Sequence, residues 1–397
     1  MNWDQVRTSL ADEPLPTAVI DLDAVDANFD TLVAAMGTTP VTMRIATKSI
    51  RHIGLTRHLL QRGGSRFRGL MCFCAREAAF LAEQGFDDLL IAYPFARTDE
   101  AELVASLTAV GTRVFATVDH PDHIALLSEA ARRHGTTIRV CLDVDVALRA
   151  GPAHFGVRRS PIRCVEDATA VGTAIAQASG VRLSAILAYE ALVAGVQDRT
   201  ASKLTDAVIR LLKGRTRPLA TQRRLDVVAA LEAQGHDIEV VNGGGTGSVG
   251  FTAHDGSVTE ITAGSGFLCP HLFDGYRDLD LKPAAFFAIQ VARISDAGFV
   301  TCLGGGYPAS GAAGPDRLPI PWLPRGLSAV NMEGFGEVQT PLRWTGRGPA
   351  PAIGDPVLCR HAKAGELAER FDSYALVRSG RIVDRQPTYR GMGQTFL

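Results

Sequence analysis

Long uninterrupted apolar runs are missing from this sequence of 397 residues. No stretch approaches the roughly 18 to 20 consecutive apolar residues that a membrane-spanning helix needs. The first residues also lack a basic region followed by an apolar one, which is the pattern of a secretory signal. We therefore expect a cytoplasmic protein that has no membrane partner.

An excess of charge of one sign is also absent. Lys and Arg together number 41 against 42 for Asp and Glu, and the basic residues form no block and no basic helix. Nucleic acids and anionic membranes attract such positive patches, so neither is an expected partner. The expected ligand is a small-molecule substrate.

A cysteine framework is lacking as well. The seven cysteines are scattered along a long chain and are odd in number, which argues against a set of disulfides. Cys72 and Cys74 have the spacing of residues on one face of a strand, but no second pair follows to complete a metal clip. We interpret both as core residues of a strand.

The sequence does contain a regular alternation of short apolar runs with amphipathic helical stretches, which is typical of βα units around a parallel sheet. The predicted strands are residues 42–47, 68–74, 88–92, 112–117, 137–143, 181–188, 237–242 and 258–263. Eight such strands predict an α/β fold of the (β/α)₈ TIM barrel type, which we assign to residues 16–272.

After about residue 270 the helical periodicity fades and alternating runs typical of strands take its place. The runs begin near Phe286, Phe299, Pro356 and Tyr374. A mainly β C-terminal domain is therefore predicted for residues 273–397, with residues 1–15 as an extension that packs on it. The length of the chain is sufficient for two domains.

Lys48 ends the first predicted barrel strand, directly after Met43-Arg44-Ile45-Ala46-Thr47. In barrels of this type the C-terminal strand ends carry the chemistry, so Lys48 is a candidate reactive amine. Neighbouring cations such as Arg44 favour its neutral form, which attacks a carbonyl to give a Schiff base. A lone lysine at a strand end otherwise simply extends into solvent.

Two glycine clusters follow the seventh and eighth predicted strands. Five glycines fall between Gly243 and Gly250, and Gly264 and Gly266 form the second cluster. Glycine lets the backbone approach an anion and point its N–H groups at it, and the neighbouring hydroxyls of Thr246 and Ser265 are further donors. Since these two loops are the usual phosphate site of such barrels, a phosphate cradle is predicted here.

An amine that forms a Schiff base, next to a phosphate cradle, suits a ligand with an aldehyde and a phosphate, namely pyridoxal 5′-phosphate. The sequence resembles the fold-type III pyridoxal-phosphate enzymes, which have an alanine racemase-like barrel and a β domain. It is most similar to the branch of D-serine dehydratases and D-threonine aldolases, and to bacterial proteins described as amino acid deaminase/aldolase. The resemblance is carried by Arg44-x-x-x-Lys48-Ser49, Gly244-Gly245-Thr246-Gly247, residues 260–265, the loop 304–327 and His361-Ala362-Lys363.

The resemblance implies specific roles for individual residues. Lys48 holds the cofactor and Tyr189 lies near the pyridine ring, while His361 and Lys363 are candidates for handling the proton of the substrate's β-hydroxyl. The remaining implied cofactor-binding residues are Arg44, Gly244, Gly245, Thr246, Gly247, Gly264 and Ser265. By the same resemblance, the protein is expected to be a homodimer in which the β domain of one subunit helps to close the active site of the other.

The implied activity is that of a lyase on a β-hydroxy-α-amino acid of D configuration. It proceeds either by β-elimination with deamination or by retro-aldol cleavage of the Cα–Cβ bond. Three alternatives stay open: an amino-acid racemase, a carrier of pyridoxal phosphate without turnover, and a class I aldolase in which Lys48 reacts with a sugar phosphate. The long segment after residue 273 argues against a small carrier.

One position departs from the family pattern. The similar dehydratases and aldolases are expected to bind a divalent metal through a histidine and, two positions later, a cysteine or an aspartate. Here that second position is Lys363, whose ammonium repels a cation and cannot ligate while protonated. The sequence therefore argues against a divalent metal, with Cys359 and His361 as the alternative ligand pair.

Overall fold

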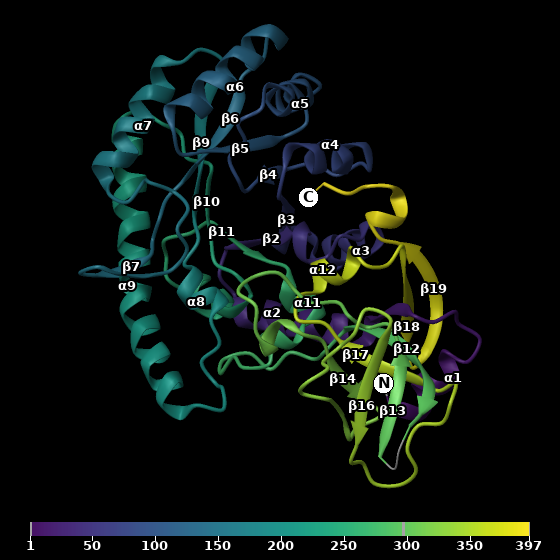
Figure 1. Cartoon of the computed structure of the whole chain (residues 1–397). Helices are drawn as coiled ribbons and strands as arrows, with labels where there is room; N and C mark the ends of the chain where they lie inside the picture. The colour runs from purple at the N-terminus through teal and green to yellow at the C-terminus, as the bar shows by residue number, and fades with distance from the viewer. Residues whose placement is uncertain (1, 296–297, 397) are drawn as a thin grey trace.

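A closed barrel of eight parallel strands forms one half of the molecule, in the upper part of Figure 1. This computed structural model describes residues 2–295 and 298–396. The barrel strands are β2 (Thr42–Ala46), β3 (Phe67–Cys72), β4 (Leu89–Ile91), β5 (Val114–Val118), β6 (Ile138–Asp143), β9 (Val181–Ala188), β10 (Val240–Gly243) and β11 (Glu260–Ala263). Each of them overlaps a predicted strand, and the predicted fold class is confirmed.

Helices cover the outside of the barrel, as the alternating pattern predicts. They are α2 (Leu22–Met36), α3 (Ile53–Gly63), α4 (Ala75–Glu83), α5 (Thr98–Ala109), α6 (Pro121–His134), α7 (Val165–Gln177) and α9 (Lys203–Ala233). Three short helices follow the last barrel strands: α8 (Ala191–Gly195), α10 (Val249–Thr252) and α11 (Ser265–Leu268). The longest, α9, has 31 residues and runs along the left side of Figure 1. Among the described residues, none of the helices combines the length and the apolar character needed to cross a bilayer.

A second sheet of nine strands forms the other half of the molecule. Its strands are β1 (Thr17–Asp21), β12 (Ala285–Ile294), β13 (Phe299–Leu303), β14 (Ile320–Leu323), β15 (Leu327–Ala329), β16 (Gln339–Trp344), β17 (Pro356–Arg360), β18 (Ser373–Arg378) and β19 (Arg381–Pro387). Two short helices accompany it, α1 (Trp3–Ser9) and α12 (Ala364–Ala368). A separate hairpin, β7 (Leu148–Ala150) and β8 (Ala153–Phe155), follows barrel strand β6.

Strand β1 lies inside the range predicted for the barrel, yet it pairs with the second sheet. Ala18 is opposite Phe287 in the antiparallel neighbour β12 and opposite Tyr374 in the parallel neighbour β18. The helix before it belongs to the same half, since Val6 of α1 packs in one apolar cluster with Phe286. The second half is therefore built from both ends of the chain.

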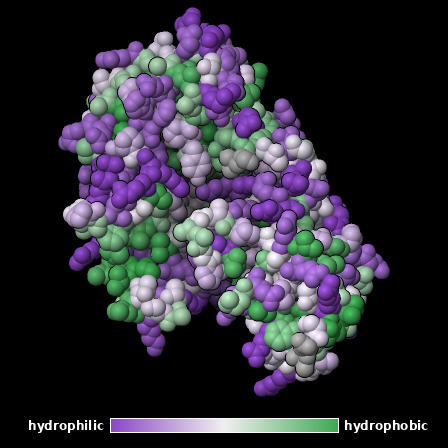
Figure 2. Space-filling view, viewed as in Figure 1, coloured by the Kyte–Doolittle hydropathy of each residue, from purple (hydrophilic) through white to green (hydrophobic). Residues whose placement is uncertain are grey.

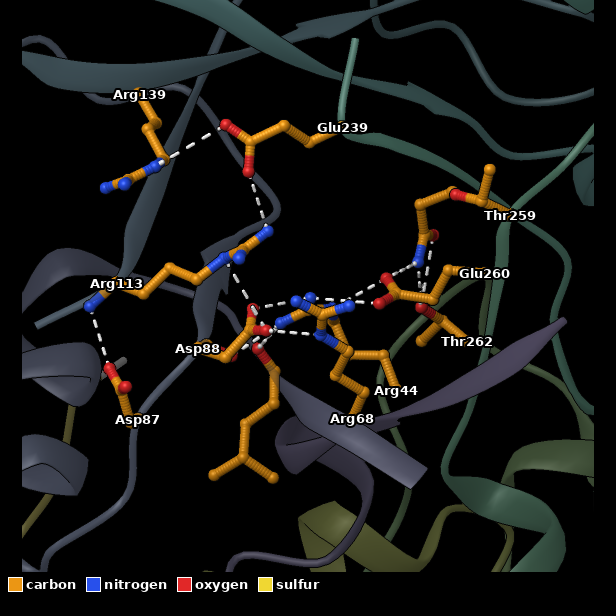
Figure 3. Close-up of polar contacts among 12 residues, drawn as sticks. Arg44, Arg68, Asp87, Asp88, Arg113, Arg139, Glu239, Thr259, Glu260 and Thr262 are labelled. Carbon is orange, nitrogen blue, oxygen red and sulfur yellow. Dashed lines mark hydrogen bonds and ion pairs between the residues drawn. The ribbon is translucent and has the colours of Figure 1, made fainter. Parts of the chain in front are cut away.

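Arg44 of β2 is completely buried below the barrel mouth, where it joins three strands (Figure 3). Its Nε donates to Glu260 Oε1 at 2.7 Å, and one Nη donates to Asp88 Oδ1 at 2.7 Å. Gly69, at φ +69°, leaves the room that this guanidinium occupies, because a Cβ there would overlap it. Burial opposes the charge, but Glu260 and Asp88 hold the pKa of Arg44 above its ordinary value.

We predict that Arg44→Met destabilises the fold by about 3–5 kcal/mol, because Glu260 is then left as a buried carboxylate without its cation. Urea unfolding measures the effect. Arg97→Met is the matched control, since Arg97 pairs with Asp99 at the surface and the two side chains are 75% and 60% exposed. Equal unfolding midpoints for the two variants would show that the barrel does not depend on the Arg44 ion pairs.

Candidate active site

The C-terminal ends of the barrel strands open into a cavity of about 190 Å³. Residues that follow β2, β4, β6, β9, β10 and β11 line it, so groups far apart in the sequence face one another. The residues singled out from the sequence that line this cavity are Lys48, Tyr189, Gly244, Gly245, Thr246, Gly264 and Ser265. The predicted lysine and the two predicted glycine turns thus share one space.

Lys48 follows β2 in a single 3₁₀ turn, with its side chain exposed to the cavity. Its Nζ donates a hydrogen bond to the hydroxyl of Tyr93 at 2.9 Å. Burial alone would raise the pKa of the Tyr93 phenol, but the Lys48 charge, the hydrogen bond to it and Arg159 bring that pKa below its ordinary value. The hydrogen bond to Tyr93 therefore fixes how the Lys48 amine is oriented in the cavity.

Glu190, which is 1% exposed, holds the glycine turn after β10 in place through hydrogen bonds. Glu190 accepts hydrogen bonds from the Gly244 N–H at 3.0 Å and from the Ser248 hydroxyl at 2.8 Å. Its other partners are the Thr252 hydroxyl and the Arg224 guanidinium, which comes from α9. Although burial acts to raise it, the pKa of Glu190 is held below its ordinary value by Arg224 and these hydroxyls.

The turn after β11 is joined to the first turn and to the Lys48 segment by hydroxyl groups. The Thr246 Oγ1 accepts from the Gly266 N–H at 3.0 Å, and Ser265 Oγ lies 2.9 Å from Ser49 Oγ. Ser49, Thr246 and Ser265 all line the cavity. Three hydroxyl groups therefore converge at the end of the cavity formed by the two glycine turns.

This end of the cavity fits the phosphate of the expected cofactor. The backbone of Gly244 has a φ of +76°, a conformation that favours glycine. A Cβ on Gly245 would lie 3.0 Å from Ala194 Cβ and 3.1 Å from Tyr189 Cε2. Because Gly244 and Gly245 have no side chains, their backbone lies directly against the cavity. Hydroxyl and backbone N–H donors of this kind are the ordinary ligands of a phosphate group.

Tyr189 forms the floor next to this end of the cavity. Burial, together with the neighbouring Glu190 charge, raises the pKa of its phenol to about 12. The phenol therefore keeps its proton at neutral pH. A ring nitrogen placed against it would receive a hydrogen bond and only a small share of positive charge.

Four residues singled out from the sequence are not brought into the cavity lining within the described part of the chain. The guanidinium of Arg44 is held by Glu260 and Asp88, which departs from the expected contact with the cofactor. Gly247 faces the neighbouring depression on the other side of its turn. His361 and Lys363 lie in the second half of the molecule.

His361 and Lys363 approach the Lys48 segment from outside the barrel. The helix α12 that follows them packs against the 3₁₀ turn of Lys48, so closely that a Cβ on Gly365 would overlap the Lys48 carbonyl oxygen. His361 is buried, and its Nε2 has no hydrogen-bond partner among the described residues. Burial lowers the pKa of His361 below its ordinary value.

The donor set around His361 does not suit a divalent metal. Lys363 Nζ donates to Ser310 Oγ at 2.7 Å and lies 3.1 Å from Glu366 Oε1, so the nearby carboxylate is already paired with an ammonium. The Cys359 thiol is fully buried, and burial raises its pKa well above its ordinary value. Among the described residues, no group of three or more His, Cys, Asp or Glu side chains is placed to hold a metal ion.

Tyr93, Asp143 and Arg159 also line the cavity, although no sequence pattern singles out Tyr93 or Arg159. Asp143 ends barrel strand β6, so its position at the rim was readable from the strand pattern. Arg159 comes from the loop after the β7–β8 hairpin, and that hairpin was not predicted. Its guanidinium lies over the Tyr93 ring, 5.5 Å from the centroid.

Comparison with known proteins places these features in a family. Residues 20–266 match the family described as alanine racemase, N-terminal domain. The 3-hydroxy-D-aspartate aldolase of Paracoccus denitrificans (strain Pd 1222) is 28% identical over 253 residues, which cover 63% of this chain and 59% of that protein. The D-threonine aldolase of Arthrobacter sp is 26% identical over 260 residues, covering 64% of this chain and 61% of that protein.

Solved structures agree with the fold over nearly the whole chain. The D-threonine aldolase from Filomicrobium marinum has a TM-score of 0.81 at 23% identity, and the alignment covers 96% of each chain. The D-threo-3-hydroxyaspartate dehydratase from Delftia sp. HT23 has a TM-score of 0.75 at 18% identity, covering 96% of this chain and 98% of that one. At these identities the likeness concerns the fold.

We predict that Gly245→Val raises the dissociation constant for pyridoxal 5′-phosphate about tenfold or more, because the valine side chain would clash with Ala194 and Tyr189. Absorbance titration of the apoprotein measures it. Gly250→Ala in the same run is the control, since a Cβ there makes only an ordinary contact, 3.8 Å from Ala35 O. Unchanged affinity in Gly245→Val would place the phosphate elsewhere.

Proposed function

This chain belongs to the family of the alanine racemase N-terminal domain, and on that premise we propose that it is a pyridoxal phosphate-dependent lyase of β-hydroxy-α-amino acids with D configuration. The observation that carries the proposal is the shared cavity of Lys48 and the two glycine turns. The names of the relatives, aldolases of 3-hydroxy-D-aspartate and of D-threonine, support the substrate class. The matched regions span about 60% of those relatives.

When bound, the cofactor supplies an electron-withdrawing ring that stabilises negative charge on the substrate's Cα. Lys48 offers the amine that bonds to the aldehyde carbon, and Tyr93 aims that amine through its hydrogen bond. The Thr246 and Ser265 hydroxyls and the glycine turns would hold the phosphate. The phenol of Tyr189, which keeps its proton, would donate a hydrogen bond to the cofactor's ring nitrogen without transferring the proton to it.

The Lys48 amine lies next to the Tyr93 hydroxyl, and when it is not bonded to the cofactor it would take or return the Cα proton of the substrate. His361 and Lys363 are our candidates for the proton of the β-hydroxyl. Their support is the unpartnered Nε2 of buried His361 and the direct packing of the following helix on the Lys48 turn. Loss of the hydroxyl leads to a keto acid and ammonia, and cleavage of Cα–Cβ leads to glycine and an aldehyde.

We also propose that two copies associate through the first half of α9. Leu204, Val208 and Leu211 recur there on one helix face and are 78%, 49% and 57% exposed. Figure 2 shows hydrophobic residues gathered over this lower part of α9, facing the space beside the β half. The division at residues 16–272 and 273–397 and the cytoplasmic location stay predictions.

The first prediction for this function is that Lys48→Ala lowers turnover of D-threonine and D-serine by roughly 10³-fold or more, because Lys48 is the one lysine among the described residues that line the cavity. Assays of aldehyde, keto acid and ammonia measure it. Lys282→Ala, at an exposed lysine outside the cavity, is the control. Near wild-type turnover in Lys48→Ala would end the assignment. Exchange of Cα–H in alanine without bond cleavage would favour a racemase.

The second prediction is that chelators leave turnover nearly unchanged. Lys363 already provides a positive centre beside His361, and its ammonium would repel a divalent ion at that point. Activity after treatment with EDTA measures this, and Lys363→Cys should create metal binding. If chelation removed activity and zinc or manganese restored it, the argument from Lys363 would be wrong.

The third prediction is that Leu204→Glu combined with Leu211→Glu converts a dimer into a monomer, because two carboxylates would be buried in an apolar interface. Light scattering on a sizing column measures the mass. Val110→Glu is the control, since Val110 is equally apolar and 80% exposed but lies on another helix end. A wild-type protein that is an active monomer would refute the proposed association.

A further inference from the structure

The part of the cavity wall at the end of β6 carries a carboxyl group that the reaction above does not use. We propose that this group, on Asp143, makes the site select β-hydroxy amino acids with a single carboxylate and reject those with a second carboxylate on the side chain. The inference rests on the proposed function, because it concerns the substrate of the same cavity.

Asp143 is the last residue of β6 and lines the cavity together with Lys48 and Tyr93. Its main-chain oxygen accepts from the Ser160 hydroxyl at 2.6 Å, which fixes the strand end. Its carboxyl group makes no hydrogen bond or ion pair with the described residues, and the residue is partly exposed to the cavity. The carboxyl group is therefore available to whatever fills the cavity.

The neighbouring Asp145 also lines the cavity, but its carboxylate is used by the loop. It accepts from the Ala147 N–H at 2.8 Å and lies 3.6 Å from Arg163 and 3.8 Å from Arg149. Asp145 therefore holds the loop in place. Of the two carboxylates, only Asp143 is left to meet a substrate.

Few positively charged side chains line the cavity. Lys48 bonds to the cofactor in the proposed reaction, and Arg159 is the one arginine among the described residues that line the cavity. It stands over the Tyr93 ring at the mouth. An amino-acid substrate brings one α-carboxylate, which Arg159 can pair with. For a second carboxylate, the described residues that line the cavity offer no further lysine or arginine.

A second carboxylate on the substrate would instead meet Asp143. Burial, together with the nearby Asp119, raises the pKa of Asp143 to about 7, against the effect of Arg159. At pH 8.5 the group is largely ionised, and two like charges in an enclosed site repel each other. A neutral side-chain substituent carries no such charge, so Asp143 does not repel it.

The test compares two isosteric ligands that have no β-hydroxyl to react, D-asparagine and D-aspartate. Binding to the holoenzyme at pH 8.5 is followed by the change in cofactor absorbance. We expect D-asparagine to bind at least about tenfold more tightly than D-aspartate, and this ratio to fall within about threefold in Asp143→Asn. Asp122→Asn, at an 89% exposed carboxylate outside the cavity, should keep the wild-type ratio.

A holoenzyme that binds D-aspartate as well as D-asparagine, or that binds neither, overturns the inference. The inference is also overturned if Asp143→Asn keeps the wild-type affinity ratio of D-asparagine to D-aspartate. If Asp143→Asn does not fold, Asp143→Ser is used for the same comparison. Cleavage of D-threonine is measured on the same preparation. The expected ratio without any cleavage would refute the proposed reaction alone and leave the selectivity of Asp143 standing.

Discussion

The arrangement of the site depends on one buried carboxylate, that of Glu190. It receives the Gly244 N–H, the Ser248 and Thr252 hydroxyls and the Arg224 guanidinium, so it joins the end of β9, the turn after β10, the helix α10 and the long helix α9. Burying an unpaired carboxylate would destabilise the fold, and the hydrogen bonds and the ion pair with these four partners offset that loss of stability. The turn is thereby held in the form that faces the cavity.

The cavity has two walls of different chemistry around Lys48. On one side the glycine turns and the hydroxyls of Thr246 and Ser265 suit a phosphate, and on the other lie the side chains of Tyr93, Asp143 and Arg159. Lys48 lies between them because its short turn leaves β2 at the barrel mouth. Below this mouth, Arg44 binds Glu260 and Asp88 and closes the barrel from the inside (Figure 3).

The barrel strands, Lys48 and the glycine turns could be predicted from the sequence because they depend on local patterns: apolar runs, strand ends and clustered glycines. The pairing of β1 could not, since its partners near Phe287 and Tyr374 are distant in the sequence and its own residues only indicate a strand. The burial of Arg44 was missed for a similar reason. Its partners Glu260 and Asp88 come from other strands, and a charge inside a strand looks the same whether it is paired or exposed.

The central claim is that Lys48 carries the cofactor, and reduction of the purified protein with borohydride tests it most directly. The account predicts visible absorbance that disappears on reduction, followed by a pyridoxyl phosphate mass on the peptide that contains Lys48 and on no other peptide. A colourless protein after incubation with pyridoxal 5′-phosphate, or a label on a different lysine, would contradict it.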